Sequence, residues 1–174
     1  MNDRKKSLLE FQARLSERLR EAASGVTPAA RLGVLVGDRR MLVELSEAGE
    51  VVPMPASIAA VPLTRDWFCG LVNLRGALYA VSDLGQFAGG PPTPAGRDAR
   101  LIAVAPRLGL NAAIAVARML GLQSVETMRR VPHPDAADRP AWLGDDWQDE
   151  QGKLWTELSL ADLVADERFL AVAR

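Results

Sequence analysis

The pattern of apolar and polar positions changes once along the chain, from a helical period near the start to short apolar runs after residue 30. In residues 1–24, Ser7 to Glu10 has the form of a capping box, in which the Ser and Glu side chains bind free backbone amides. Apolar side chains then recur every three or four positions, at Leu8, Phe11, Leu15, Leu19 and Ala22. We expect an amphipathic helix over residues 1–24, packed either on its own domain or on a partner, and a separate domain over residues 25–174.

Short apolar runs separated by turn residues predict a mainly β domain from residue 31 to about residue 122. Gly37-Asp38-Arg39 separates the first two runs, and Arg75-Gly76 separates the runs at residues 70–74 and 77–81. A two-residue connection with Gly second suits a tight hairpin turn, because Gly accepts positive φ. Prolines at positions 53, 55 and 62 place the segment between these hairpins at a sheet edge or in a loop.

The second half of the pattern is less uniform. Residues 89–97, GGPPTPAGR, predict an exposed connection between two halves of the β region. For residues 110–122 the pattern fits either a helix or strands, because the alanines favour a helix while the place of the segment in the chain favours strands. Near-helical spacing of Leu160, Leu163, Val164 and Phe169 predicts a closing helix. Close spacing of short strands favours compact barrels over a doubly wound sheet.

Composition and charge limit the partners. The formal net charge is −1 and the isoelectric point is about 5.9, which argues against a nucleic-acid-binding or membrane-surface protein. No apolar run approaches the roughly 18 residues that a membrane span requires. The single Cys69 has no partner for an internal disulfide and reads as a small buried residue, so we expect a cytoplasmic protein.

Candidate catalytic chemistry is sparse. The one histidine, His133, lies between two prolines without a second ligand for zinc. Asp145, Asp146, Asp149 and Glu150 form an acidic cluster that suits either a general acid and base pair or, more simply, a solvated turn. Trp142, Trp147 and Trp155 favour packing over a stacking platform, because no basic residues alternate with them. We expect no enzyme activity, cofactor or metal.

The segment GLVNLRGALYAVSDL, residues 70–84, resembles the signature of the CheW-like chemotaxis coupling domain. That pattern reads Gly, two hydrophobic residues and Asn-Leu-Arg-Gly, followed after four or five residues by a hydrophobic residue, any residue and Asp-Leu. The matching positions are Gly70, Asn73, Leu74, Arg75, Gly76, Val81, Asp83 and Leu84. The resemblance extends over residues 31 to 165, and it departs from the family at Ala80, where proline is usual, and at Arg118, where an acid is usual.

The resemblance implies a fold of two small five-stranded, Src-homology-3-like barrels around a shared core, with an N-terminal helix and a C-terminal helix. It implies a non-enzymatic adaptor that couples the cytoplasmic tips of methyl-accepting chemoreceptors to the regulatory domain of a sensor histidine kinase. The N-terminal helix and the C-terminal ending are most similar to coupling proteins of the system that controls type IV pilus twitching motility. A flagellar-type chemotaxis array is the alternative, and a β-barrel nucleic-acid-binding module is a more distant one.

The same resemblance implies a partner-binding site around the hairpin. Arg75 is displayed for a partner or for a neighbouring acid, and Glu50 is the acid expected to pair with it. Asn73 and Asp83 are expected to satisfy nearby backbone or side-chain groups. We therefore predict that Asn73, Arg75, Gly76, Glu50 and Asp83 form the site.

Overall fold

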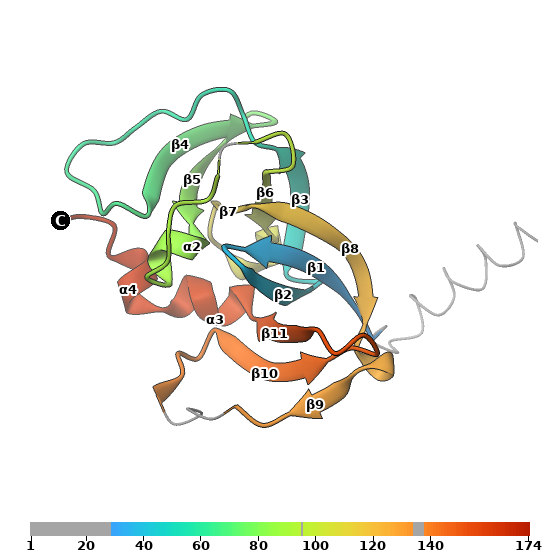
Figure 1. Cartoon of the computed structure of the whole chain (residues 1–174). Helices are drawn as coiled ribbons and strands as arrows, with labels where there is room; N and C mark the ends of the chain where they lie inside the picture. The colour runs from blue at the N-terminus through green and yellow to red at the C-terminus, as the bar shows by residue number, and fades with distance from the viewer. Residues whose placement is uncertain (1–28, 95, 134–137) are drawn as a thin grey trace, which may run out of the picture.

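Two mixed β-sheets make up most of the computed structural model, which describes residues 29–94, 96–133 and 138–174 (Figure 1). The helix expected over residues 1–24 lies outside the described residues. Its packing, on its own domain or on a partner, therefore stays a prediction. Within the described ranges, no helix is long and apolar enough to cross a membrane.

The first sheet has six strands and is antiparallel except where β11 runs parallel to β2. Its strands, in spatial order, are β8 (Arg118–Ser124), β1 (Ala30–Val36), β2 (Arg39–Glu44), β11 (Leu154–Leu158), β10 (Leu143–Gln148) and β9 (Arg129–Val131). The hairpin predicted around Gly37-Asp38-Arg39 is the β1–β2 hairpin, and its turn places Gly37 at φ 59°. This sheet thus joins strands from both ends of the domain.

The second sheet has five strands and is antiparallel except where β5 runs parallel to β7. Its strands, in spatial order, are β3 (Ala48–Pro53), β6 (Arg100–Val104), β7 (Ala112–Val116), β5 (Ala77–Asp83) and β4 (Phe68–Leu74). The proline-containing β3 lies at one edge, as predicted, where a missing N–H breaks no ladder. The prediction of a mainly β fold with two small five-stranded barrels is confirmed, except that the short β9 gives one of the two sheets a sixth strand.

Helices are few and short in the described part of the chain. They are α2 (Leu84–Phe87), α3 (Leu160–Ala165), α4 (Glu167–Leu170) and the 3₁₀ turns η1 (Pro106–Leu108) and η2 (Val125–Thr127). The single closing helix predicted from spacing is two helices, because Asp166 leaves the helical region at φ −70° and ψ 119° and begins α4 as its N-cap. Its carboxylate accepts from the Arg168 amide at 2.8 Å, which is an ordinary capping bond.

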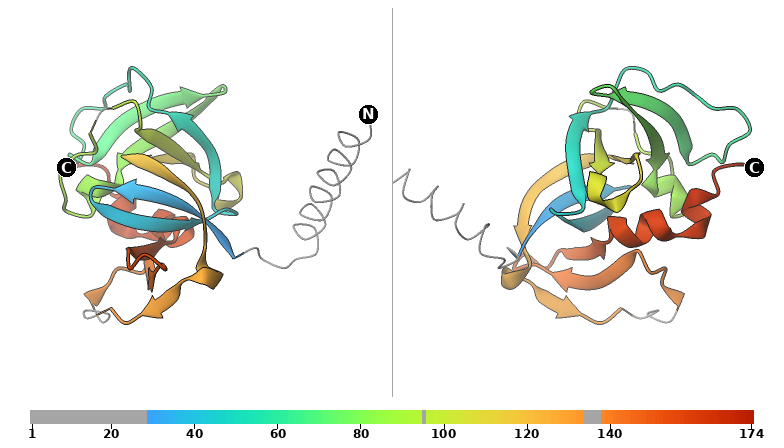
Figure 2. Two further views of the ribbon diagram at one scale, coloured as in Figure 1. Left: turned by 45° about the vertical axis from the view of Figure 1, so that its right-hand side comes forward. Right: turned by 180° about the vertical axis from the view of Figure 1, so that it is seen from behind.

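A shared core holds the two sheets together, with α3 and α4 against it (Figure 2). It combines residues of the first sheet, the second sheet and the C-terminal helices, among them Val43, Ile114, Leu160 and Phe169. A smaller cluster lies within the second sheet and contains Val72, Val81, Leu101, Ala113 and Ala115. Strand β7 serves both clusters, so all five of its residues are buried.

The burial of β7 on both faces explains why the sequence pattern did not decide between a helix and strands for residues 110–122. A strand buried on both faces has no polar alternation, and its pattern is not distinguishable from a short buried helix. The segment forms β7 and β8, which belong to different sheets. The chain changes sheets after β2 and again at Ala117, so residues 89–97 connect α2 to β6 within one sheet and do not divide the β region as predicted.

A buried carboxylate that the sequence did not single out ties the two sheets to α3. Glu47, in the turn between β2 and β3, accepts from the Leu160 amide at 2.7 Å through Oε2. The Glu47 carbonyl accepts from the Ala105 amide at 2.8 Å. Glu47 therefore caps the first turn of α3 although it lies 113 positions earlier in the sequence. A negative charge is stabilising there, because the backbone amides of the first turn have no partner within the helix.

Candidate functional site

The β4–β5 hairpin carries the GLVNLRG motif and lies at the free edge of the second sheet. Residue 59, in the loop after β3, exchanges two backbone hydrogen bonds of 2.9 Å with Leu71 and so bridges back to β4. Gly70 permits this close approach, because a Cβ at that position would lie 2.2 Å from the Ala59 carbonyl oxygen. Its φ of 126° is also a conformation that favours glycine. The first glycine of the motif therefore helps to close the sheet.

The turn of the hairpin projects Arg75 at its tip. Arg75 has φ 49° and Gly76 has φ 89°, the two positive values of a tight primed turn. Asn73 Oδ1 accepts from the Gly76 amide at 2.8 Å, which satisfies a donor that the turn leaves free. The hairpin predicted from Arg75-Gly76 is confirmed, and Asn73 and Gly76 hold its shape.

Arg75 and Glu50 form an ion pair, with Arg75 Nη2 2.7 Å from Glu50 Oε1. Glu50 belongs to β3, at one edge of the five-stranded sheet, and Arg75 follows β4, at the other edge. The pair therefore spans the open side of a curled sheet. The expected pairing of Arg75 with Glu50 is present. The Arg75 side chain is 82% exposed, so the pair adds at most about 1 kcal/mol to stability. Its remaining N–H donors face solvent and are available to a partner.

Asp83 lies at the opposite end of β5 from Arg75 and is only 4% exposed. Its Oδ1 accepts from the Gln86 amide at 3.2 Å and from the Thr93 hydroxyl at 2.9 Å, and its Oδ2 accepts from the Thr93 amide at 2.5 Å. It is the N-cap of α2 and holds the loop after α2 in place. Among the five predicted site residues, Asp83 is therefore separated from the other four and has a positioning role.

Cys69 lies next to this region. Its Sγ is 3.9 Å from the Trp67 carbonyl oxygen. Burial, and then the negative charge of Asp83, raise the pKa of the Cys69 thiol above its ordinary value despite a hydrogen bond that acts the other way. The thiol is thus protonated at neutral pH. Cys69 is only partly buried, packed against the smaller cluster, and not fully buried as predicted.

We expect Asp83→Asn to lower the free energy of unfolding by about 1–2 kcal/mol, because an amide presents a donor where three donors already converge. Urea unfolding measures the change. Thr93→Val is the matched control, since it removes only the hydroxyl contact and should cost less. An Asp83→Asn protein as stable as wild type would contradict the positioning role.

Sequence analysis missed one exposed apolar residue near the tip. Leu78 lies opposite Asn73 in the β4–β5 ladder and is 56% exposed. Its strand was recognised as apolar, but the pattern does not say which face each residue takes when neighbours on both faces are apolar. An exposed leucine beside a displayed arginine is a combination that suits a protein interface.

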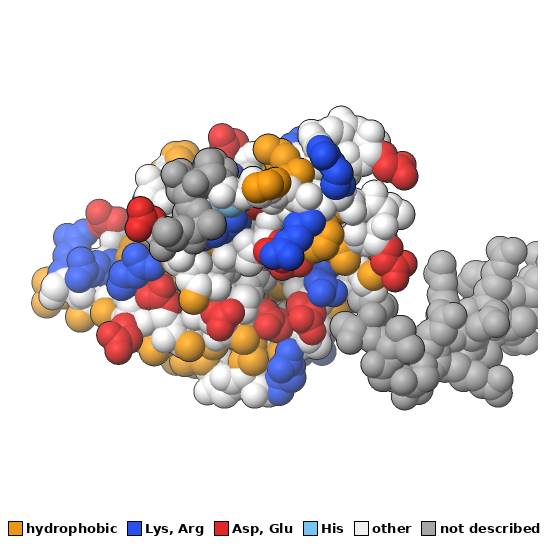
Figure 3. All heavy atoms as spheres, turned by 90° about the horizontal axis from the view of Figure 1, so that it is seen from below, with side chains coloured by type: hydrophobic (Ala, Val, Ile, Leu, Met, Phe, Trp, Pro, Cys, Tyr) orange, Lys and Arg blue, Asp and Glu red, His pale blue; other side chains and the backbone are white. Residues whose placement is uncertain are grey.

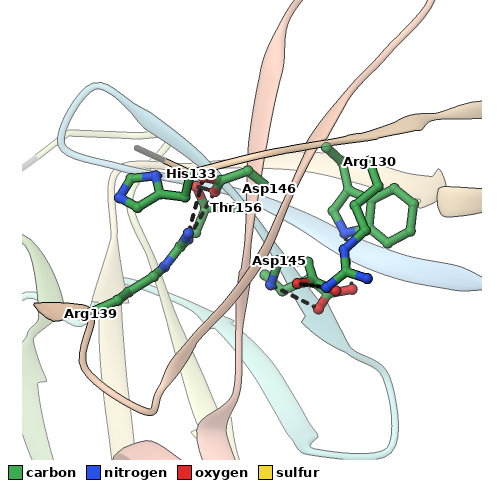
Figure 4. A network of polar contacts seen from close by, with 8 residues as sticks. Arg130, His133, Arg139, Asp145, Asp146 and Thr156 are labelled. Atoms are coloured by element: carbon green, nitrogen blue, oxygen red, sulfur yellow. Dashed lines mark hydrogen bonds and ion pairs between the residues drawn. The ribbon is translucent and has the colours of Figure 1, made fainter. Parts of the chain in front are cut away.

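The acidic cluster is not one solvated turn. Asp145 and Asp146 lie in β10, and Asp149 begins the turn that leads to β11. Asp146 is the centre of the network in Figure 4, where it accepts from Arg139 at 2.8 and 3.0 Å and from the Thr156 hydroxyl at 2.7 Å. His133 Nδ1 lies 2.7 Å from its Oδ2. Burial alone would raise the pKa of Asp146, but the hydrogen bonds from Arg139 and Thr156 and the nearby positive charges lower it below its ordinary value.

The direction of that shift predicts a pH dependence. A carboxyl with a lowered folded-state pKa stabilises the protein above its unfolded pKa of about 3.9 and loses this contribution as the pH falls through the folded-state pKa. We expect Asp146→Asn to cost about 1–2 kcal/mol at pH 7, because Arg139 is 10% exposed and loses its charged partner. Urea unfolding should show the two proteins converging in acid, below both pKa values. A constant difference at every pH would contradict this reading.

The remaining candidates have structural partners. Asp149 accepts from the Trp155 indole at 3.0 Å and from two backbone amides of its own turn. Trp142 and Trp155 are buried, which confirms packing as their role. Trp147 donates to Glu157 at 3.1 Å. In the part of the chain that the structure describes, no group of three or more His, Cys, Asp and Glu side chains is placed to hold a metal ion.

Two curled sheets share one core, and a Gly-x-x-Asn-Leu-Arg-Gly hairpin forms one edge of the second sheet. This fold and this motif together define the class of protein. The model of the CheW-like domain matches residues 31–168, and the chain belongs to this family. One relative, protein PilI of Pseudomonas aeruginosa strain PAO1, is 28% identical over 170 residues, which cover 91% of this chain and 92% of the relative. The crystal structure of the scaffolding protein TtCheW from Thermoanaerobacter tengcongensis matches with a TM-score of 0.64 at 22% identity, over 76% of this chain and 90% of that one. That match confirms the fold.

Proposed function

We propose that this chain is a non-enzymatic adaptor that couples the cytoplasmic tips of methyl-accepting chemoreceptors to the regulatory domain of a sensor histidine kinase. The observation that carries the proposal is the hairpin tip. Its backbone is fixed by Asn73 and Gly76, while the Arg75 guanidinium is exposed and adds little to folding. A rigidly presented side chain that stability does not require is available for recognition, and arginine is enriched at interface hot spots.

The partner-binding surface in this proposal consists of Asn73, Arg75, Gly76, Glu50 and Leu78. Glu50 orients the guanidinium, and Leu78 adds apolar area beside it. Asp83 is not part of the exposed surface and acts indirectly, by fixing the end of β5 that lies away from Arg75. A preorganised surface of this kind loses little conformational freedom when a partner binds.

We propose further that the system is the one controlling type IV pilus twitching motility, and that the protein works in the cytoplasm at membrane receptor arrays. Similarity to protein PilI over nearly the whole of both chains supports this choice over a flagellar-type array. The surface supports a protein partner over nucleic acid. On the face seen in Figure 3, basic side chains gather at one end and acidic side chains lie across the middle, so no continuous basic stripe crosses this face, in keeping with a net charge of −1.

Pull-down of the full chain from a lysate of its own organism, followed by mass spectrometry, tests the proposal. We expect a histidine kinase and chemoreceptors to be recovered with the wild-type protein, and pilus-associated receptors among them. Recovery of nucleic acid, or of neither a kinase nor a receptor, would contradict the adaptor role. Recovery of flagellar-array components alone would contradict the pilus assignment and leave the adaptor role in place.

A further inference from the structure

A hollow of about 680 Å³ lies where the segment before β4, the helices α2 and α4, and the segment before β10 meet. Its lining includes Trp67, Phe87 and Trp142. These rings pack edge to face and tilted, with centroids 5.1 Å apart for Trp67 and Phe87 and 5.7 Å apart for Phe87 and Trp142. The hollow therefore has an aromatic floor that is fixed by ring contacts, and its size is in the range of ligand sites.

Three arginines surround this floor. Arg39, Arg65 and Arg168 line the hollow, against the single carboxylate of Glu167. Arg168 is held by Asp166 at 2.9 Å, but among the described residues neither Arg39 nor Arg65 takes part in an ion pair. Figure 3 shows basic side chains gathered at the end of the molecule that carries α4 and the C-terminus. The rim is thus positive, and two of its cations lack a counter-charge in the part of the chain that the structure describes.

One buried donor in the lining also lacks an acceptor. Trp142 is 3% exposed, and its Nε1–H makes no hydrogen bond within the described ranges. An unpaired buried donor destabilises the folded protein. This N–H is itself buried from solvent, so the argument for an occupant with oxygen acceptors rests on the two arginines of the rim that have no ion pair among the described residues.

We propose that this hollow binds an acidic peptide segment of a partner protein, with an apolar side chain on the aromatic floor and carboxylates on Arg39 and Arg65. Arginine matches a carboxylate with two parallel N–H donors, which makes this pairing directional. The hollow is open rather than enclosed, which suits an extended segment. The chain's own residues 1–28 fit poorly, because they carry six Lys or Arg against four Asp or Glu.

This site is separate from the hairpin tip. Arg75 precedes β5, whereas Asp83 at the end of β5 leads into α2, which lines the hollow. A seven-residue strand spans about 20 Å, so the two sites are at opposite ends of the sheet. An adaptor with a second site of this kind can hold a further protein without displacing the partner at Arg75.

Selection from a random-peptide phage library on the immobilised full chain tests the proposal. We expect enriched peptides to place Asp or Glu on both sides of Leu, Ile, Phe or Trp. Synthetic copies should bind wild type at least about tenfold more tightly than the double variant Arg39→Glu/Arg65→Glu. Arg97→Glu is the control, since it makes the same Arg-to-Glu reversal at one position outside the lining and should bind as wild type does.

Amide shifts in NMR spectra should locate the peptide at Phe87 and Ala171. If the double charge reversal disturbs the fold, Arg39→Gln and Arg65→Gln replace it singly. Three results would overturn the proposal: no enriched peptide, enriched peptides without an excess of acids, or equal affinity for wild type and the arginine variants. None of them bears on the hairpin tip, because Arg75 is unchanged in every variant.

Discussion

Replacing Arg75 with alanine should weaken binding to at least one signalling partner by about 2 kcal/mol or more, roughly thirtyfold, without unfolding the protein. Its ion pair with Glu50 is exposed, so its loss should change the free energy of unfolding by less than about 1 kcal/mol. In a complex the guanidinium is desolvated against a carboxylate or carbonyl, where each hydrogen bond is stronger. The prediction is a binding defect in a folded protein.

Titration of wild type and Arg75→Ala against receptor cytoplasmic fragments and against the kinase regulatory domain measures this effect. Arg174→Ala is the matched control, because it removes an exposed arginine that is paired with Asp66 without touching the hairpin. Arg75→Lys should recover only part of the affinity, since lysine keeps the charge and loses the planar fork. If Arg75→Ala binds both partners normally, Arg75 is only a turn residue. If it unfolds the protein, the pair with Glu50 is structural.

Gly70→Ala should lower the free energy of unfolding by about 3 kcal/mol or more. The new Cβ would lie 2.2 Å from the Ala59 carbonyl oxygen, and the neighbouring atoms are backbone that is already hydrogen-bonded to Leu71. Relief requires either loss of that bridge or a shift of β4, and alanine is also strained at φ 126°. The sheet would open at the bridge between residue 59 and β4, toward the end of β4 away from Arg75.

Two glycine controls separate the causes. Gly76→Ala has strain at φ 89° but no atom within 4 Å of its Cβ, so it should cost only about 1 kcal/mol. Gly96→Ala has neither problem and should be neutral within about 0.5 kcal/mol. Urea unfolding ranks the three variants. If Gly70→Ala costs no more than Gly76→Ala, the close approach to Ala59 does not hold the sheet closed.

The sequence allowed the hairpins to be predicted, because the signals for a tight turn are local. Arg75-Gly76 needs positive φ at two adjacent positions, and Gly supplies one of them without strain. The sequence also allowed Glu50 to be named as the partner of Arg75, through the family resemblance. Neither inference required knowledge of which strands are neighbours.

Long-range pairing was beyond the reach of local patterns. The parallel pairing of β11 with β2 joins Thr156 to Met41, and no periodicity reports it. The role of Glu47 could not be predicted, because one glutamate among several charged neighbours has the pattern of a solvated residue. Its partner, the Leu160 amide, comes near it only when α3 packs on the folded domain. The acidic cluster was read as a turn for a similar reason, since Arg139 and Thr156 pair with Asp146 only after β10 and β11 form.

Kinase activity in a reconstituted system tests the central claim most directly. The kinase and receptor fragments recovered with the wild-type chain are combined at saturating receptor, with and without this protein, and phosphate transfer to the kinase's response regulator is measured. An adaptor acts by raising the effective concentration of receptor at the kinase. We predict that the rate changes when the chain is added, and that Arg75→Ala loses most of this effect at concentrations that saturate the wild type. Equal rates with and without the chain would contradict the account.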